Sequence, residues 1–270
     1  MGNIHLLIID PQNDFCNPDG ALFVKGADQD MKNLATFINH ASSFINEIHV
    51  SLDSHRTIDI AHPIFWINDK GEHPNPFTII GVDDVKKGIW MATRESWRVI
   101  GLTYVEALAE NGRYPLCIWP PHCIIGTYGH SIVKDVSDAL IKWENDRFGV
   151  VDYISKGSNI CTEHYSAYKA DVAYHSDPST LPNKVLLKAL TEADEIIVAG
   201  EALSHCVRNT VQDLITDMPE GSAKKFVLLR NATSSVSSFE KMGDDFISEM
   251  TTKGMRLTDT GTRLLSFLFI

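Results

Sequence analysis

Basic residues are scarce in this sequence relative to acidic ones. The 270 residues include 24 lysines and arginines against 35 aspartates and glutamates, which gives a formal net charge of −11 at pH 7. Nucleic acids and anionic membrane surfaces attract basic protein surfaces, so this balance disfavours both as partners. We therefore expect neither a nucleic acid nor a membrane among the binding partners.

Long hydrophobic runs are also missing. No apolar stretch approaches the roughly 20 residues that a membrane span needs. The first apolar run, residues 6–9, is too short for the core of a secretion signal, and no basic segment precedes it. The expected location is the cytoplasm.

Cysteine is sparse and irregularly placed. The five cysteines are odd in number, and no two of them have C-x-x-C spacing. In a long chain without a signal segment, this usage is typical of reduced thiols and not of a disulfide framework. One of these thiols is a candidate nucleophile.

Glycine and proline are not enriched, with 17 and 11 residues. Hydrophobic residues make up 44% and charged residues 22%, which excludes a disordered or collagen-like chain. The length suits one large domain or two small ones. Because no linker is visible, we expect a single domain over residues 1–270.

Short apolar runs alternate with segments of helical periodicity. The sequence predicts strands at 4–9, 48–52, 150–154, 195–199 and 226–229, with shorter apolar runs at 116–119 and 256–258. It predicts helices at 30–45, 104–110, 131–144, 183–190, 204–215 and 239–253. This alternation is typical of an α/β fold with three layers, αβα, around a central and mostly parallel sheet.

Residues 67–113 break the alternation, and we interpret them as an insertion. The segment is rich in aromatic residues, in it or beside it, including Trp66, Phe77, Trp90 and Trp97. Apolar content of this kind marks a lid or an interface. We therefore expect the insertion to cover the site or to form a subunit contact in a homo-oligomer.

Polar clusters follow four of the predicted strands. Their members are Asp10, Asp53 with His55, Lys156, and the turn 200–206 that ends in Cys206. Ligands of open parallel sheets bind beyond the carboxyl ends of the strands, so these distant residues are expected at one rim.

Cys206 lies at the start of a predicted helix, where the helix dipole stabilises a thiolate. Asp10 could take the thiol proton and pass it to a leaving amine, and Lys156 could orient Asp10. Taken singly, these residues have structural interpretations: a buried cysteine, a loop-capping aspartate and a surface lysine. Their convergence favours catalysis.

A second group has the chemistry of a metal site. Asp53 and His55 project on one side of an extended segment, and His122 follows a rigid Trp-Pro-Pro turn. One carboxylate and two imidazoles suit zinc, iron or manganese with positions left open. His62 is a further candidate ligand, or else a surface histidine.

Together these segments resemble the isochorismatase-like cysteine hydrolases, and among them the nicotinamidase/pyrazinamidase type. The segments that carry the resemblance, in chain order, are 7–16 (LIIDPQNDFC), 53–55 (DSH), 119–123 (WPPHC), 155–157 (SKG) with 165–167 (YSA), 198–202 (VAGEA) with Cys206 and Val207, and 231–235 (NATSS). They run from about residue 4 to 260.

The resemblance implies the isochorismatase-like hydrolase fold and a role for each matching residue. Cys206, Asp10 and Lys156 would form the catalytic triad, and Asp53, His55 and His122 would hold one divalent metal ion. Substrate binding would involve three further residues: Phe15 and Trp119, which would sandwich an aromatic ring, and Ala202, whose N–H would join that of Cys206 in an oxyanion hole. Glu163 falls where some family members place an acid near the metal. The peptide bond that enters Ala202 is cis in the family.

The resemblance further implies a metal-dependent amidohydrolase that deamidates nicotinamide, or pyrazinamide-like amides, through a thioester, in NAD salvage and pyridine nucleotide biosynthesis. Leu203 and Ser204 depart from the usual Thr-Asp of the nucleophile turn. Two alternatives stay open: a related hydrolase of another small amide or ureido compound, and a catalytically silent protein that binds a small molecule.

Overall fold

A central six-stranded sheet organises the protein in a computed structural model that describes residues 2–268. The strand order is β10-β9-β8-β1-β2-β7, and every neighbouring pair is parallel. The strands are β1 (Ile4–Ile9), β2 (Glu47–Asp53), β7 (Asp152–Lys156), β8 (Glu195–Gly200), β9 (Phe226–Leu229) and β10 (Arg256–Thr258). All residues of β1 are buried, as expected for a parallel strand with both faces covered.

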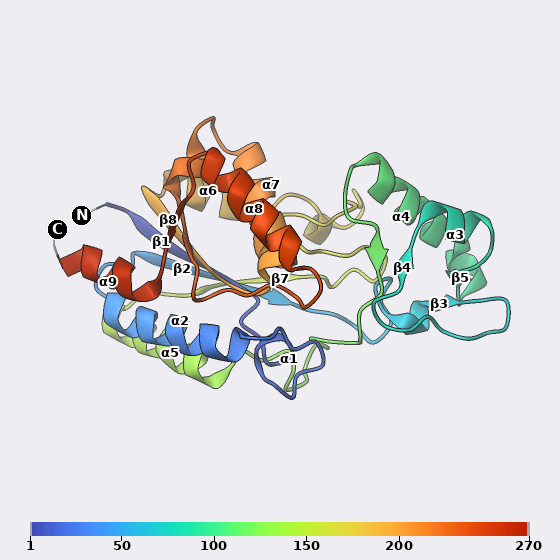
Figure 1. The fold of residues 1–270 in the computed structure, drawn as a ribbon, viewed down its shortest axis with the longest axis horizontal. Helices are drawn as coiled ribbons and strands as arrows, with labels where there is room; N and C mark the ends of the chain where they lie inside the picture. The colour runs from blue at the N-terminus through green and yellow to red at the C-terminus, as the bar shows by residue number, and fades with distance from the viewer. Residues whose placement is uncertain (1, 269–270) are drawn as a thin grey trace.

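Helices cover both faces of this sheet (Figure 1). One layer contains α2 (Ala27–Ala41), α5 (Lys134–Arg147) and α9 (Thr260–Leu268). The other contains α6 (Lys184–Glu192), α7 (Arg208–Asp217) and α8 (Glu240–Thr252). The predicted three-layer αβα fold with a parallel central sheet is confirmed.

Two element boundaries differ from the predictions around residues 131–156. Helix α5 begins later than predicted because Ile132 still pairs with Gln12 in an isolated bridge. The helix ends at Arg147, and the next residue, Phe148, has a left-handed φ of 51° and is fully exposed. Val150, which we assigned to a strand, is also exposed, so apolar character at these positions does not mark the start of β7.

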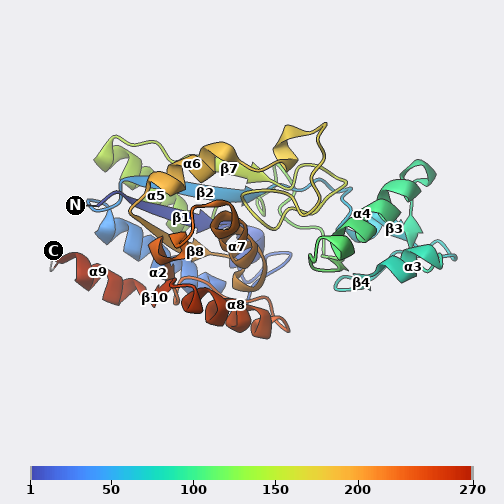
Figure 2. The same cartoon turned by 90° about the horizontal axis from the view of Figure 1, so that it is seen from above.

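Residues 66–117 form small elements of their own. They are β3 (Trp66–Ile67), β4 (Ile79–Ile80), α3 (Val82–Lys86), β5 (Met91–Ala92), α4 (Arg98–Glu110) and β6 (Leu116–Cys117). β3 pairs with β5 and β4 pairs with β6, both antiparallel. The group lies at one end of the molecule, apart from the central sheet (Figures 1 and 2). The apolar run at 116–119 is therefore not a central strand, and the helix predicted at 104–110 begins six residues earlier.

Among the described residues, none of the helices combines the length and the hydropathy that a bilayer crossing requires.

Candidate active site

The carboxyl ends of four central strands bring the polar clusters to one rim. Asp10 follows β1, Asp53 and Lys156 are the last residues of β2 and β7, and Cys206 follows β8. The strand register places Asp53 directly beside Lys156. Chain connections lead from β1 to β2 on one side and return to β8 on the other, so the site lies where the strand order reverses.

The ammonium group of Lys156 contacts several of the other polar groups in the site. Its Nζ lies 2.9 Å from Oδ2 of Asp10, 3.0 Å from Oδ1 of Asp53 and 3.6 Å from Sγ of Cys206. The ammonium also donates a hydrogen bond of 2.9 Å to the carbonyl oxygen of His164. The side chain is 1% exposed, so the charge is compensated by these groups and not by water.

Burial and charge set opposing pKa shifts in this group. Burial raises the pKa of the Cys206 thiol well above its usual range, and Lys156 only partly opposes this. Burial also raises the pKa of Asp10, again against the Lys156 charge. For Lys156 burial works the other way, but Asp10 and Asp53 outweigh it and hold the pKa well above normal. Burial therefore favours the neutral form of the thiol, so that formation of a thiolate needs a base nearby.

Cys206, the candidate nucleophile, lies in a π-helical turn, Leu203–Val207, that leads into α7. The peptide bond between Glu201 and Ala202 is cis, as the resemblance implies. Leu203 is buried and faces Gly243 of α8, while the Ser204 hydroxyl accepts a hydrogen bond from the Val236 amide.

A buried Asp–His–His group lies beside the candidate triad of Asp10, Lys156 and Cys206. Ligand atoms of Asp53, His55 and His122 all lie within 4.8 Å of one another. Oδ2 of Asp53 is 3.1 Å from Nε2 of His55 and 3.4 Å from Nε2 of His122. This mixed oxygen and nitrogen donor set fits a divalent zinc, iron or manganese ion.

The outer nitrogens of both imidazoles are already engaged. Nδ1 of His55 lies 3.1 Å from Oδ2 of Asp59, and Nδ1 of His122 lies 2.8 Å from the carbonyl oxygen of Pro120. Such partners fix the tautomer that leaves Nε2 free for a metal. His62 is also buried; its ring packs against His55 and His122, and its Nε2 has no hydrogen-bond partner among the described atoms.

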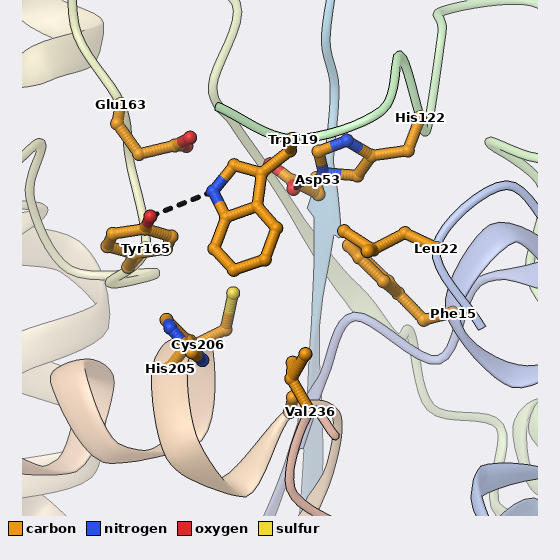
Figure 3. A pocket seen from close by; sticks show the side chains of 11 residues that line it. Phe15, Leu22, Asp53, Trp119, His122, Glu163, Tyr165, His205, Cys206 and Val236 are labelled. Atoms are coloured by element: carbon orange, nitrogen blue, oxygen red, sulfur yellow. Dashed lines mark hydrogen bonds and ion pairs between the residues drawn. The ribbon is translucent and has the colours of Figure 1, made fainter. Parts of the chain in front are cut away.

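A cavity opens onto both groups (Figure 3). Its lining consists of Phe15, Leu22, Asp53, Trp119, His122, Glu163, Tyr165, Ala202, His205, Cys206 and Val236. The Cys206 thiol points toward the Trp119 indole, and Phe15 approaches from another wall (Figure 3). Leu203 and Ser204 are not among these residues, so the departure in the nucleophile turn lies outside the cavity surface.

Hydrogen bonds fix the positions of an aromatic and an acidic side chain that line the cavity, Trp119 and Glu163. Nε1 of Trp119 donates to the Tyr165 hydroxyl at 2.9 Å. The Glu163 carboxylate, 3.9 Å from Nε2 of His55, accepts a hydrogen bond from the His164 amide. Burial raises the pKa of Glu163 to about 8.

Three positioning residues were not found from the sequence. The Ser51 hydroxyl donates to Oδ1 of Asp10 at 2.5 Å, and Gln12 bonds both the amide and the carbonyl of Asp53. Asp59 engages His55, as described above. Ser51 lies two residues before Asp53 in β2, and Asp59 lies four residues after His55. Polar residues at such spacings are too common in sequences to identify these two as part of a site.

The segment 67–113 supports the walls of the site. Among the described residues that line the cavity, none belongs to this segment. However, Phe77 packs edge-on against Trp119, and the Tyr104 hydroxyl accepts a hydrogen bond from the Glu163 amide. Arg113 donates hydrogen bonds to both carboxylate oxygens of Asp213 and so ties the segment to α7.

Comparisons with known proteins agree on one family. No family model matches the chain. The nicotinamidase of Saccharomyces cerevisiae is 26% identical over 210 residues, which cover 76% of this chain and 78% of the yeast protein.

Solved structures show the same fold. The structure of the yeast nicotinamidase Pnc1p has a TM-score of 0.66 at 20% identity and covers 95% of this chain and 99% of that one. A nicotinamidase/pyrazinamidase of Acinetobacter has a TM-score of 0.64, also at 20% identity, over 97% and 98% of the two chains. In sequence the chain is similar to the yeast nicotinamidase, and it shares the fold of solved nicotinamidases and pyrazinamidases.

Proposed function

We propose that this protein is a metal-dependent cysteine amidohydrolase that converts nicotinamide, or a pyrazinamide-like amide, to the acid and ammonia. The observation that carries the proposal is the position of Lys156. One buried ammonium contacts the candidate base Asp10, the candidate nucleophile Cys206 and the candidate metal ligand Asp53 beside a single cavity.

The first half of the reaction forms a thioester. Asp10 accepts the proton of the Cys206 thiol as Sγ attacks the carboxamide carbon, and the carbonyl π electrons move to the oxygen. The N–H groups of Ala202 and Cys206 stabilise this oxyanion. When the tetrahedral intermediate collapses, the C–N bond breaks and Asp10 returns the proton to the leaving nitrogen as ammonia departs.

The second half regenerates the thiol. Asp10 takes a proton from water as the water oxygen attacks the thioester carbon. The C–S bond then breaks, the acid leaves, and the proton returns to Sγ. Throughout, Lys156 holds the Asp10 carboxylate beside the nucleophile.

Asp53, His55 and His122 would hold the divalent metal ion. Once bound, the ion would supply a Lewis-acidic position for a ring nitrogen of the substrate and so orient the ring. A pyrazinamidase of Pyrococcus horikoshii was solved in complex with zinc, which supports this assignment.

Ligands of related proteins support a pyridine carboxamide as substrate. The yeast nicotinamidase was solved with the inhibitor nicotinaldehyde, and the PnC1 protein of L. infantum with nicotinate. The nucleophile-turn residues that differ from the family, Leu203 and Ser204, do not line the cavity, so they leave its surface suited to the same ring. The reaction would serve NAD salvage.

The remaining features of the proposal concern assembly and location. We propose one domain with an insertion, acting in the cytoplasm as a homo-oligomer. Exposed apolar side chains in the insertion support a subunit contact there: Phe77, Ile79, Ile89 and Val99.

Ammonia release tests the proposal directly. The purified protein is incubated with nicotinamide, pyrazinamide and a ureido compound, each with and without a chelator. We expect release from the two aromatic amides, lost with chelator and restored by a divalent metal. Release from the ureido compound alone would favour the related hydrolase, and no release from any amide would favour a silent binding protein.

A further inference from the structure

A second histidine cluster lies at the opposite end of the sheet from the active site. His5 is the second residue of β1, and Glu47 and His49 are in β2. The register pairs His5 with Glu47, and residues two apart on a strand share a face, so all three project from one face of the sheet. His5 and Asp10 are five positions apart, which corresponds to about 16 Å along the strand.

The three side chains bring ligand atoms to coordination spacing. Nδ1 of His5 lies 3.1 Å from Nε2 of His49. Oε2 of Glu47 lies 3.8 Å from the first nitrogen and 3.7 Å from the second. A point equidistant from the three atoms is about 2.1 Å from each, which matches zinc–nitrogen and zinc–oxygen bonds.

A fourth residue orients one of the imidazoles. Asp152 of β7 is the register partner of His49, and its Oδ2 lies 2.9 Å from Nδ1 of that ring. The carboxylate keeps the proton on Nδ1 and so presents the Nε2 lone pair to His5 and Glu47. Carboxylate–histidine pairs of this kind accompany most histidine metal ligands.

Burial and accessibility are also suited to a metal site. His5 is 1% exposed and His49 is 3% exposed, so the two rings are held rigidly and stack on each other. Glu47 is 54% exposed, which gives an ion a path to the site and leaves room for a water ligand. Nitrogen-rich donors favour zinc-like ions over magnesium or calcium.

We propose that His5, Glu47 and His49 form a second binding site for a divalent transition metal of the zinc class. Its ligands come from two neighbouring strands, so an occupied site joins β1 to β2 at their amino ends. Because binding to the folded chain alone shifts the unfolding equilibrium, the ion stabilises the protein without touching the catalytic rim.

Zinc binding to the full-length protein, stripped by a chelator and then dialysed, tests the proposal. Titration calorimetry and elemental analysis are expected to find two zinc ions per chain. His49→Gln should reduce this to one ion and keep amide hydrolysis, whereas a variant with both His55→Ala and His122→Ala should retain one ion and lose hydrolysis. Glu47→Gln, at a half-exposed position that tolerates substitution, should weaken the second site at least tenfold.

The control is His40→Gln, which removes an exposed histidine on α2 and should leave both sites intact. Zinc should also raise the melting temperature of the His55→Ala/His122→Ala variant, and this rise should shrink when Glu47→Gln is added. The proposal is overturned if that variant binds no zinc at micromolar concentration. It is also overturned if neither Glu47→Gln nor His49→Gln alters its binding, since the two histidines would then only share a hydrogen bond.

Discussion

The ammonium group of Lys156 lies 2.9 Å from the Asp10 carboxylate, and both side chains are buried. The same ammonium lies 3.0 Å from the Asp53 carboxylate, so one cation compensates two buried anions. Removal of one partner from a buried ion pair leaves an uncompensated charge, which costs about 3–5 kcal/mol.

Lys156→Met is therefore expected to lower the free energy of unfolding by about 3–5 kcal/mol and to abolish hydrolysis. Urea denaturation and ammonia release measure the two effects. Lys188→Met is the matched control, because Lys188 is exposed on α6 and its ion pair with Glu192 contributes at most about 1 kcal/mol. An active Lys156→Met variant of native stability would contradict the role given to this residue.

Cys206→Ala is expected to reduce ammonia release from nicotinamide at least 1,000-fold, because the thioester cannot form. Cys206→Ser should also be severely impaired, since the serine hydroxyl is much harder to ionise. Cys161→Ala removes a partly exposed thiol elsewhere and should retain wild-type turnover. Wild-type turnover by purified Cys206→Ala would exclude the nucleophile role.

Asp59→Ala is expected to weaken metal binding at the candidate active site about 10- to 100-fold, since outer partners of metal-binding histidines have effects of this size. The variant removes the carboxylate that holds Nδ1 of His55. Zinc titration in the His49→Gln background isolates this site. Asp69→Asn, on an exposed turn, should leave the zinc affinity unchanged. If Asp59→Ala also bound zinc as tightly as the parent protein, the contact between Asp59 and His55 would not support metal binding.

The sequence predicted the fold, and it predicted that polar residues after several strands would meet at one rim, because both depend on local signals. Apolar runs such as residues 4–9 and 195–199 mark buried strands directly, and a polar residue at the carboxyl end of such a run marks the rim. The contact of Lys156 with Asp10 was expected from these signals, but its further contact with Asp53 could not be read in this way. It depends on strand order, which only the tertiary structure fixes.

Other features were hidden for different physical reasons. The raised pKa of the Cys206 thiol follows from burial, and burial of this residue is not visible in its neighbours along the chain. The role of Asp59 depends on a loop that turns its carboxylate back toward His55. The division into one domain with an insertion, and the contribution of that insertion to an oligomer, stay predictions.

Benzamide is expected to be a much poorer substrate than nicotinamide, with a KM at least tenfold higher. Both rings can stack on Phe15 and Trp119, and aromatic contacts of this type contribute about 0.5–1.5 kcal/mol beyond area burial. Only the pyridine carries a nitrogen that a divalent metal can bind. Equal kinetic constants for the two amides would show that ring recognition is apolar alone.

His205 supplies a prediction about acid stability that is independent of catalysis. This histidine is buried between Trp119, Tyr165 and Phe239, and burial, with a smaller contribution from Arg208, lowers its pKa to about 3. An unfolded histidine titrates near pH 6.5. Because the folded pKa is depressed, the folded state is favoured at neutral pH, and this advantage is lost as the pH falls below about 6.5.

Between pH 7 and pH 5 the unfolded chain gains a proton at this position while the folded chain does not. The linkage relation gives a loss of about 2 kcal/mol over this interval, and any folded pKa below about 4 gives nearly the same figure. We therefore expect His205→Gln to reduce the fall in the free energy of unfolding between these two pH values by about 2 kcal/mol. Urea denaturation at both pH values measures the difference, with His40→Gln on the exposed face of α2 as the control. If His205→Gln loses as much stability as the wild type over this interval, burial does not keep the imidazole neutral. The protonated imidazole would then be stabilised in the folded state by water or by a carboxylate.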